Sequence, residues 1–383
     1  MLFRKKLLLF KPESTYGVDA NPTGSANAIH TRNLSIQTFQ GNTVDLNYDK
    51  PRLGNSVSIY TGPYTKFSFE CDLASSGTAG TPPPVGVLLR ACGFQEKINA
   101  TAVTGTATAG STTTITLAAG ASATDGAYVN FRIRITAGTG NSQGAVISNY
   151  VGATKVATVA TPWTIPPDAT SQYSIDAQVV YSPISGSFES ATGYFYLDGE
   201  LHKMLGARGS FVATFAKDAL PIAKFDFTAL RVAAASGANP TPDFSAWKQP
   251  LPVNKANTQT LSVHGYVANC ESVNFDIGNK VVYRNVIGSE SALITDRAPK
   301  GTLAIEKPAI GTKDFEALIA ASATDALYVK HGVSAGETVL CRAEDVQLSN
   351  PQYSDSDGLV LMTMDHKPIP SDAGDDELRI FFL

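Results

Sequence analysis

Hydrophobic and polar residues alternate along several segments of this chain, and the clearest case is KFSFECDL at residues 66–73. There Phe67, Phe69 and Cys71 alternate with charged or hydroxyl side chains. The same period of two recurs in residues 222–230, 131–136 and 302–307. A period of two places successive side chains on opposite faces of an extended strand. The pattern therefore predicts a mainly β protein whose strands are half buried.

Residues 194–230 are predicted to form a β-meander. The aromatic run YFYL at 194–197 is followed by Asp198-Gly199, a pair typical of a tight hairpin turn. No residue pattern of a catalytic site occurs in this segment, so the meander favours a structural or binding role.

Two short helices are expected between the strands. In residues 85–92 the apolar side chains fall at helical spacing, with Pro84 before the segment and Gly93 after it. Near the C-terminus, Thr312 is expected to cap a second helix whose apolar face includes Phe315 and Leu318.

The composition changes sharply at residues 100–173, which are rich in Ala, Thr, Gly and Ser with few charges. Because the period of two persists there, we expect a small all-β insert rather than disorder. We call residues 100–173 the insert. Residues 233–255 are rich in Pro, Ala and Asn, which predicts an interdomain linker with Trp247 as an aromatic anchor.

The order of strand, short helix and meander occurs on both sides of that linker, which favours two related β domains. We expect an N-terminal arm and first strand at 1–45, and a first domain at 46–99 and 174–246. The insert would interrupt this first domain on its outer face, and a second domain would span 247–383.

Bulk composition narrows the class of protein. The chain has 383 residues, a formal net charge of −4 and only 17% charged residues, so it lacks the basic surface that grips nucleic acid. The N-terminal MLFRKKLLLFKPES has too short an apolar run for a signal peptide, and we interpret it as an arm or edge strand that docks elsewhere. No segment predicts insertion into a membrane.

Candidate chemistry is sparse, and we predict no catalytic, cofactor-binding or metal-binding residue and no enzymatic activity. None of the five histidines has metal-ligand spacing, and Cys71 and Cys92 are expected to be buried free thiols. The acidic clusters at 355–357 and 372–377 are expected to be solvated turns, because the full calcium-loop pattern is missing. The scattered arginines are expected to be solvated or interfacial.

Several phrases occur in an order that resembles the major tail tube proteins of long-tailed (siphovirus-type) bacteriophages. They are YFYLDGELHKMLGARGSF at 194–211, PLPVNKANT at 250–258, KVVYRNVIGSESALITDRAPKGTLAIE at 280–306 and VQLSNPQYSDSDGLVLMTM at 346–364, with ESTYGVDANPT at 13–23 and LLRACGF at 88–94. Residues 134–173 are similar to a small β-module that recurs in phage tail and fibre proteins.

The resemblance implies β-sandwich or half-barrel domains, each with a flanking helix, which share sheets to form stacked rings with a continuous inner barrel. With two such domains per chain, three chains would make a pseudo-sixfold ring. The implied partners are other copies of the chain, the tape-measure protein and passing double-stranded DNA in the lumen, and other tail proteins at the tube ends. No cofactor is implied, and the implied location is the virion, after assembly in the host cytoplasm.

Two other readings stay open. A receptor- or carbohydrate-binding tail or surface protein would use the Thr/Gly-rich insert as its binding module. A glycan hydrolase would need a pair of carboxylates in a cleft.

Overall fold

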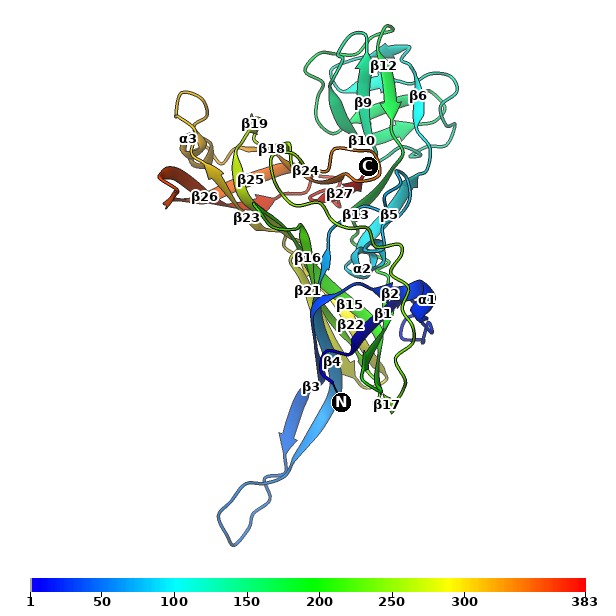
Figure 1. Cartoon of the computed structure of the whole chain (residues 1–383), viewed down its shortest axis with the longest axis vertical. Coiled ribbons are helices and arrows are strands. Elements are labelled where there is room, and N and C mark those ends of the chain that lie inside the picture. Colours follow the sequence, from blue (N-terminus) through cyan, green and yellow to red (C-terminus); the bar gives the residue numbers. More distant parts are fainter. Residues whose placement is uncertain (1) are drawn as a thin grey trace.

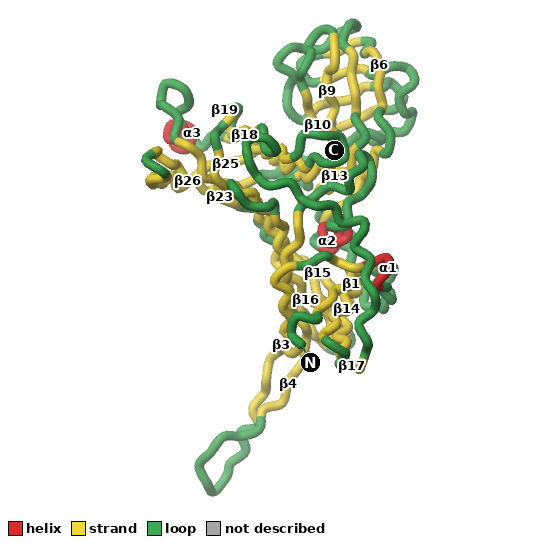
Figure 2. The backbone as a smooth tube through the Cα atoms, viewed as in Figure 1, coloured by secondary structure: helices red, strands yellow, loops and turns green. Residues whose placement is uncertain are grey.

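The computed structural model describes residues 2–383, which fold into antiparallel strands with three short helices (Figures 1 and 2). We call residues 2–236 without the insert the first half. Its elements are β1 (Lys6–Pro12), α1 (Gly24–Asn27), β2 (Ala28–Ile29), β3 (Arg32–Asp45), β4 (Ser58–Asp72), α2 (Gly86–Ala91), β5 (Phe94–Asn99), β13 (Gln178–Pro183), β14 (Ala191–Leu197), β15 (Glu200–Ala216), β16 (Ile222–Arg231) and β17 (Ala235–Ser236).

We call residues 260–383 the second half. Its elements are β18 (Thr260–Val263), β19 (Tyr266–Val267), β20 (Cys270–Asp276), β21 (Asn279–Val286), β22 (Ser289–Arg297), β23 (Gly301–Glu306), α3 (Phe315–Ala320), β24 (Thr324–His331), β25 (Val339–Ser356), β26 (Leu359–Pro368) and β27 (Arg379–Phe382).

The two halves are topological repeats of each other. Hydrogen-bonded neighbours follow the order β1–β14–β15–β16–β4–β3 in the first half. They follow β18–β24–β25–β26–β23–β20 in the second half, and the equivalent strands occur in the same order along the chain. In each half a short helix follows the strand equivalent to β4, and a two-residue strand flanks the first strand. Along the chain, the β21–β22 hairpin lies between β20 and β23, which are the equivalents of β3 and β4. It therefore corresponds to the tip of the β3–β4 hairpin.

The longest strand of each half carries a β-bulge at the same place. Two residues beginning with Gly206 oppose one residue of β16, and two beginning with Asn350 oppose one residue of β26. Both have a left-handed backbone, with φ of 60° at Gly206 and 50° at Asn350. Glycine and asparagine adopt this conformation more readily than other residues, so the sequence permits the bulge at both positions.

The halves join edge to edge in one sheet. Beyond its bulge, β15 pairs with β20, with Val212 opposite Asp276 and Ala216 opposite Ser272. This junction creates a continuous eight-stranded sheet in the order β3–β4–β16–β15–β20–β23–β26–β25. One hydrophobic cluster runs beneath it from Leu8 to Phe382, so the two halves share a core.

Aromatic side chains dominate this core in the first half. Phe67 of β4 stacks on Phe227 of β16 with ring centroids 5.1 Å apart, and Phe69 stacks on Phe225 at 5.6 Å. These are the apolar positions of the alternating segments, so the half-buried strands predicted at 66–73 and 222–230 are confirmed.

The N-terminus corrects the expectation of an arm that docks elsewhere. Strand β1 pairs with β14 over its whole length and with β2, and Leu8 and Leu9 are fully buried. An uninterrupted apolar run is buried on both faces, so β1 is a packed strand of its own chain rather than a mobile arm. Its second side is paired only at Leu8 and Leu9, which agrees with the edge strand that the sequence also suggested.

The short helices form near their predicted positions. Helix α2 ends before Gly93, whose φ is 79°. Helix α3 is capped by Asp314, whose carboxylate accepts a hydrogen bond from the Ala317 amide at 2.9 Å, so the prediction of Thr312 as the cap is wrong. The segment 237–255 runs along the surface as an extended strap, in which Trp247 Nε1 donates to the Ala28 carbonyl at 3.0 Å.

The insert forms a separate seven-stranded sheet in the order β6–β12–β9–β10–β11–β8–β7 (Figure 1). Its strands are β6 (Val103–Thr106), β7 (Ala109–Gly110), β8 (Thr114–Thr116), β9 (Arg132–Ala137), β10 (Gly144–Val151), β11 (Val156–Val159) and β12 (Gln172–Ile175). It has its own hydrophobic cluster, which includes Ile133, Ile147 and Tyr150. Within residues 2–383, none of the helices has the length and apolar character needed to span a bilayer.

The burial of β1 predicts a large effect of truncating its side chains. We expect Leu8→Ala to lower the free energy of unfolding by about 2–5 kcal/mol, because it removes a fully buried side chain from the shared core. The matched control Leu2→Ala alters a leucine that is 60% exposed and should change stability by less than about 0.5 kcal/mol. Urea unfolding followed by tryptophan fluorescence measures both values. Equal stabilities for the two variants would contradict a structural role for β1.

Candidate functional surface

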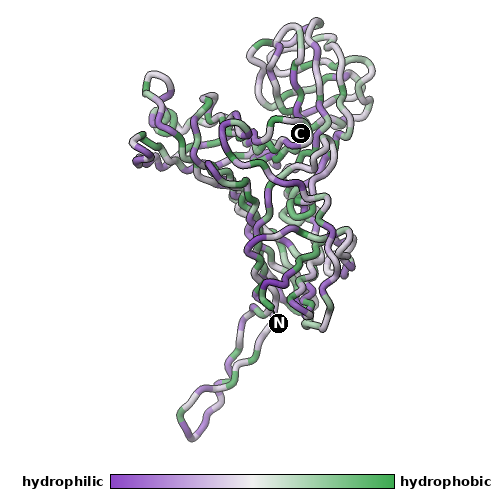
Figure 3. The backbone as a smooth tube through the Cα atoms, viewed as in Figure 1, coloured by the Kyte–Doolittle hydropathy of each residue, from purple (hydrophilic) through white to green (hydrophobic). Residues whose placement is uncertain are grey.

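One face of the eight-stranded sheet is polar, although its other face covers the core. The alternation follows the pleat, with hydrophilic and hydrophobic positions succeeding each other along the strands (Figure 3). We call the outward positions the polar face. Its principal members are Ser35, Gln37, Lys66, Ser68, Glu70, Ser210, Val212, Thr214, Lys224, Asp226, Thr228, Ser272, Asn274, Asp276, Thr302, Ala304, Glu306, Thr363 and Asp365.

The polar face continues across the junction between the halves. Asp276 of β20 lies opposite Val212 of β15, which lies opposite Lys224 of β16, which lies opposite Glu70 of β4. Residues directly opposite in antiparallel strands have neighbouring side chains, so this row forms one strip across both halves. The surface is therefore a property of the joined sheet rather than of either half.

Charges on the polar face are mixed, with an excess of acid. The basic side chains Lys66 and Lys224 are outnumbered by acidic ones, namely Glu70, Asp226, Asp276, Glu306 and Asp365. Lys224 and Asp226 lie 4.0 Å apart with more than half of each side chain exposed, so their attraction is screened by solvent. The surface lacks a concentration of positive charge that would bind phosphates tightly.

Side-chain hydrogen bonds order several polar groups of this face. Asn274 Nδ2 donates to Thr302 Oγ1 at 2.7 Å, and Asn350 Nδ2 donates to Asp365 Oδ2 at 2.8 Å. Asn33 Nδ2 donates to Glu70 Oε2 at 2.8 Å. These hydrogen bonds hold the amides and carboxylates of the polar face in place. Where the face meets β21, it is hollowed by a pocket of about 440 Å³ whose lining includes Lys66, Ser210, Asp226, Asn279 and Val281.

The insert lies on the opposite side of the core from the polar face. Strands β13, β27 and the first part of β25 form a second layer, whose inward side chains Val179, Cys341 and Ile380 join the shared core. Their outward neighbours Val180, Leu340 and Phe381 pack into the hydrophobic cluster of the insert.

Buried charges fix the insert on this second layer. Arg342 donates to Glu344 at 2.7 Å, and Thr161 of the insert donates to the same carboxylate at 3.0 Å. The neighbouring Arg379 donates to Asn130 Oδ1 of the insert at 3.2 Å. The hydrogen bonds of Arg342 and Thr161 and the charge of Arg379 hold the pKa of Glu344 below its usual value despite the burial that raises it. Because Glu344 stays ionised, it holds hydrogen-bond donors of both the insert and the second layer in place.

The burial and pairing of several arginines and acidic residues differ from what the sequence predicts. The cluster at 372–377 is not a solvated turn, because Glu377 is buried against Arg297, which also pairs with Asp375 at 2.9 Å. Arg342, expected to be solvated or interfacial between subunits, is largely buried within the chain. These partners are distant in the sequence, so spacing alone could not reveal them.

The histidines and cysteines take structural positions. His264, His331 and His366 are buried, and each has one ring nitrogen within 2.7–2.8 Å of an oxygen partner. All four cysteines are free thiols, and the prediction that Cys71 and Cys92 are buried is confirmed. Across residues 2–383, no group of three or more His, Cys, Asp or Glu side chains is placed to hold a metal ion.

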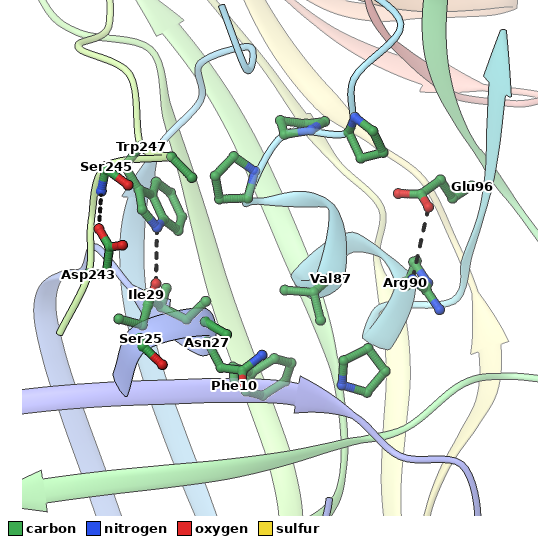
Figure 4. A pocket seen from close by; sticks show the side chains of 17 residues that line it. Phe10, Ser25, Asn27, Ile29, Val87, Arg90, Glu96, Asp243, Ser245 and Trp247 are labelled. Atoms are coloured by element: carbon green, nitrogen blue, oxygen red, sulfur yellow. Dashed lines mark hydrogen bonds and ion pairs between the residues drawn. The ribbon is translucent and has the colours of Figure 1, made fainter. Parts of the chain in front are cut away.

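A pocket of about 340 Å³ lies between the strap, α1 and α2 (Figure 4). Its walls include Phe10, Val87 and Trp247, and Arg90 stands at one end. The guanidinium of Arg90 is already paired with Glu189 at 2.7 Å and with Glu96 at 3.9 Å, so it is not available to a ligand anion. The pocket therefore offers packing surface rather than a set of converging reactive groups.

No protein-family model and no curated protein matches this chain.

Burial of His366 beneath the junction predicts a pH dependence of stability. Burial lowers the pKa of His366 from 6.5 to about 4, so the folded state keeps it neutral while the unfolded chain protonates near pH 6.5. The stability that neutral His366 contributes is fully present above pH 6.5 and is lost as the pH falls toward 4. The free energy of unfolding should therefore decrease by about 2 kcal/mol between pH 7 and pH 5.

Urea unfolding at pH 7 and pH 5 measures this loss. His366→Gln should show a smaller loss than the wild type, with the remainder due in part to His264 and His331, whose pKa values burial also lowers. The control His30→Gln changes an exposed histidine and should keep the full loss. An unchanged pH dependence in His366→Gln would contradict this assignment.

Proposed function

We propose that this protein is the structural subunit of a phage tail tube, in which chains form stacked rings and the polar face lines the lumen. The observation that carries the proposal is the junction of two topological repeats into one sheet with a polar side. A junction that repeats head to tail generates a ring when the rotation closes.

The internal repeat supports the number of chains in a ring. Each chain supplies two copies of a four-stranded unit, β3–β4–β16–β15 and β20–β23–β26–β25. Three chains would therefore place six units around one axis and close a barrel of about 24 strands. Barrels of 16–18 strands already enclose an aqueous channel, so a barrel of this size would leave a wide lumen.

The charge of the polar face suits a passage for the tape-measure protein and then for DNA. Basic side chains that neutralise phosphates release counterions and hold DNA tightly. A hydrated wall with excess acid, formed by residues such as Asp226 and Asp276, would instead let DNA slide.

The insert would face away from the lumen, because it packs on the far side of the core from the polar face. There it could contact the surroundings of the tail without obstructing the channel. A receptor- or carbohydrate-binding surface protein is the alternative reading, and the exposed loops of the insert would then be its binding surface.

Electron microscopy of the purified protein tests the proposal. We expect tubes or stacked rings that show threefold symmetry with six similar lobes when averaged along the axis. Rings with true sixfold chain symmetry would keep the tube function and contradict the three-chain ring. Discrete particles without rings at any concentration would contradict the tube and favour the surface-binding alternative.

Reversing the charge of the polar face should convert the assembled protein into a DNA-binding one. Asp226→Lys with Asp276→Lys adds roughly six basic side chains per three-chain ring, enough for a strongly salt-dependent interaction. We expect the assembled variant to retain duplex DNA at 50 mM salt and to lose roughly 10³-fold in affinity by 200 mM, as measured by fluorescence anisotropy.

The matched control places the same charges outside the polar face. Glu337→Lys with Asp372→Lys changes two exposed acidic residues of other loops. If this control bound DNA as strongly as the polar-face variant, the polar face would not be the wall that DNA meets.

A further inference from the structure

We infer that the β3–β4 hairpin of one chain docks on the free edge of β25 in a second copy. In doing so it would repeat the junction that β20 and the β21–β22 hairpin make with β15 inside each chain. The inference rests on the proposed function for the identity of its partner, but the surface itself follows from the internal repeat.

The equivalence of β15 and β25 fixes the register. Each strand has its bulge at a left-handed residue, Gly206 in β15 and Asn350 in β25. Counting onward from these residues, Val212 of β15 corresponds to Ser356 of β25. The equivalence therefore assigns each position of the distal part of β25 a counterpart in β15.

The counterpart in β15 is fully paired on both sides. One side pairs with β16, and the other pairs with β20, where Val212 lies opposite Asp276. The pairing continues past β20, since the Ile277 amide donates to the Phe211 carbonyl at 3.2 Å. Asn279 Nδ2 then donates to the Gly209 carbonyl at 3.0 Å.

The same stretch of β25 has a partner on one side only. Residues 352–356 pair with β26, whereas β24 pairs with β25 only as far as Gln347. Within residues 2–383, no strand covers the other side of 352–356. An edge with unpaired amides and carbonyls is a template for another strand.

Strand β3 is the equivalent of β20, and its outer edge is also open. β20 lies between β23 and β15, whereas β3 pairs with β4 and with no other strand in the described part of the chain. The tip of its hairpin extends well beyond the body of the molecule (Figure 1). Allowing for the bulges of β3, Asn42 takes the place of Asp276 and should lie opposite Ser356 of the second copy.

Both surfaces carry exposed apolar side chains. On the β3–β4 hairpin, Val44 is 54% exposed and Tyr60 is 53% exposed. At the end of the β25–β26 hairpin, Leu359 is 56% exposed and Val360 is 53% exposed. Apolar side chains gathered on a solvent-exposed edge mark a contact surface.

The equivalent hairpin inside the chain is already docked. Tyr283 of β21 stacks on Tyr64 of β4 with ring centroids 4.4 Å apart, and Ala292 of β22 is fully buried, with its carbonyl accepting from Arg208 at 3.1 Å. Because the chain carries this docked copy of the arrangement, a second copy of the chain is the occupant that its exposed surfaces fit.

Disulfide trapping tests the predicted register. Opposed residues of antiparallel strands have Cα atoms about 4.5–5.5 Å apart, which a disulfide can bridge. Asn42→Cys with Ser356→Cys should therefore give covalent species of up to three chains on a non-reducing gel after mild oxidation. The control pair Asn42→Cys with Thr139→Cys places the second thiol on the insert and should stay at the level of the single variants. A double variant that oligomerises but crosslinks no more than its control would overturn the inference.

Charge placed on the hairpin tests the same contact without a new covalent bond. Val44→Asp with Tyr60→Asp changes two exposed side chains, so the isolated chain should fold normally, but light scattering should report a monomer. The control Ile165→Asp alters a side chain that is 52% exposed on the insert and should leave assembly unchanged. Unchanged assembly of the hairpin variant would overturn the inference.

The outcomes separate this inference from the proposed function. Trapped rings that never stack into tubes would support the β3–β25 contact and contradict the tail tube. Tubes of the Asn42→Cys, Ser356→Cys variant that form without any disulfide between chains would support the tail tube and overturn the contact.

Discussion

The backbone ladder between β15 and β20 is the interaction on which the rest of this molecule depends. It pairs the distal part of the longest strand of the first half with a strand of the second half, from Val212 opposite Asp276 to Ala216 opposite Ser272. Without it, Phe215 and Phe275 would lose the cover of the neighbouring half, and two strand edges would face water. The shared core and the continuous polar face are both consequences of this ladder.

The β-bulge of β15 explains how one side of this long strand can pair with two different strands. Before its bulge β15 pairs with β14, and beyond it the same side of the strand pairs with β20. A bulge bends the strand and increases its twist, so the distal part can leave one layer and enter another. The two layers then enclose the aromatic core, and the polar face and the insert are left on opposite sides of it.

Much of the fold could be predicted from the sequence, and the failures have physical reasons. Strands such as β4 and β16 have one wet face, so their period of two is visible, and α2 is marked by its helical spacing. Strand β1 has no period, because both its faces are buried. The pairing of Arg297 with Glu377 joins residues that only the folded chain brings together. The residues of the polar face could be predicted, since they are the hydrophilic positions of the alternating segments. Their alignment into one surface could not, because it depends on strand register.

The insert has a further consequence for any assembly in which the halves act as equal units. In the first half β5, the insert and β13 separate α2 from β14, whereas in the second half α3 leads directly into β24. The module is therefore present once for every two units. In the three-chain ring proposed above, it would lie at alternate positions around the axis. Because the two units are fused in one chain, only every second unit carries an insert on the outside, while every unit contributes a similar part of the lining. Six identical single-unit chains could not produce this arrangement.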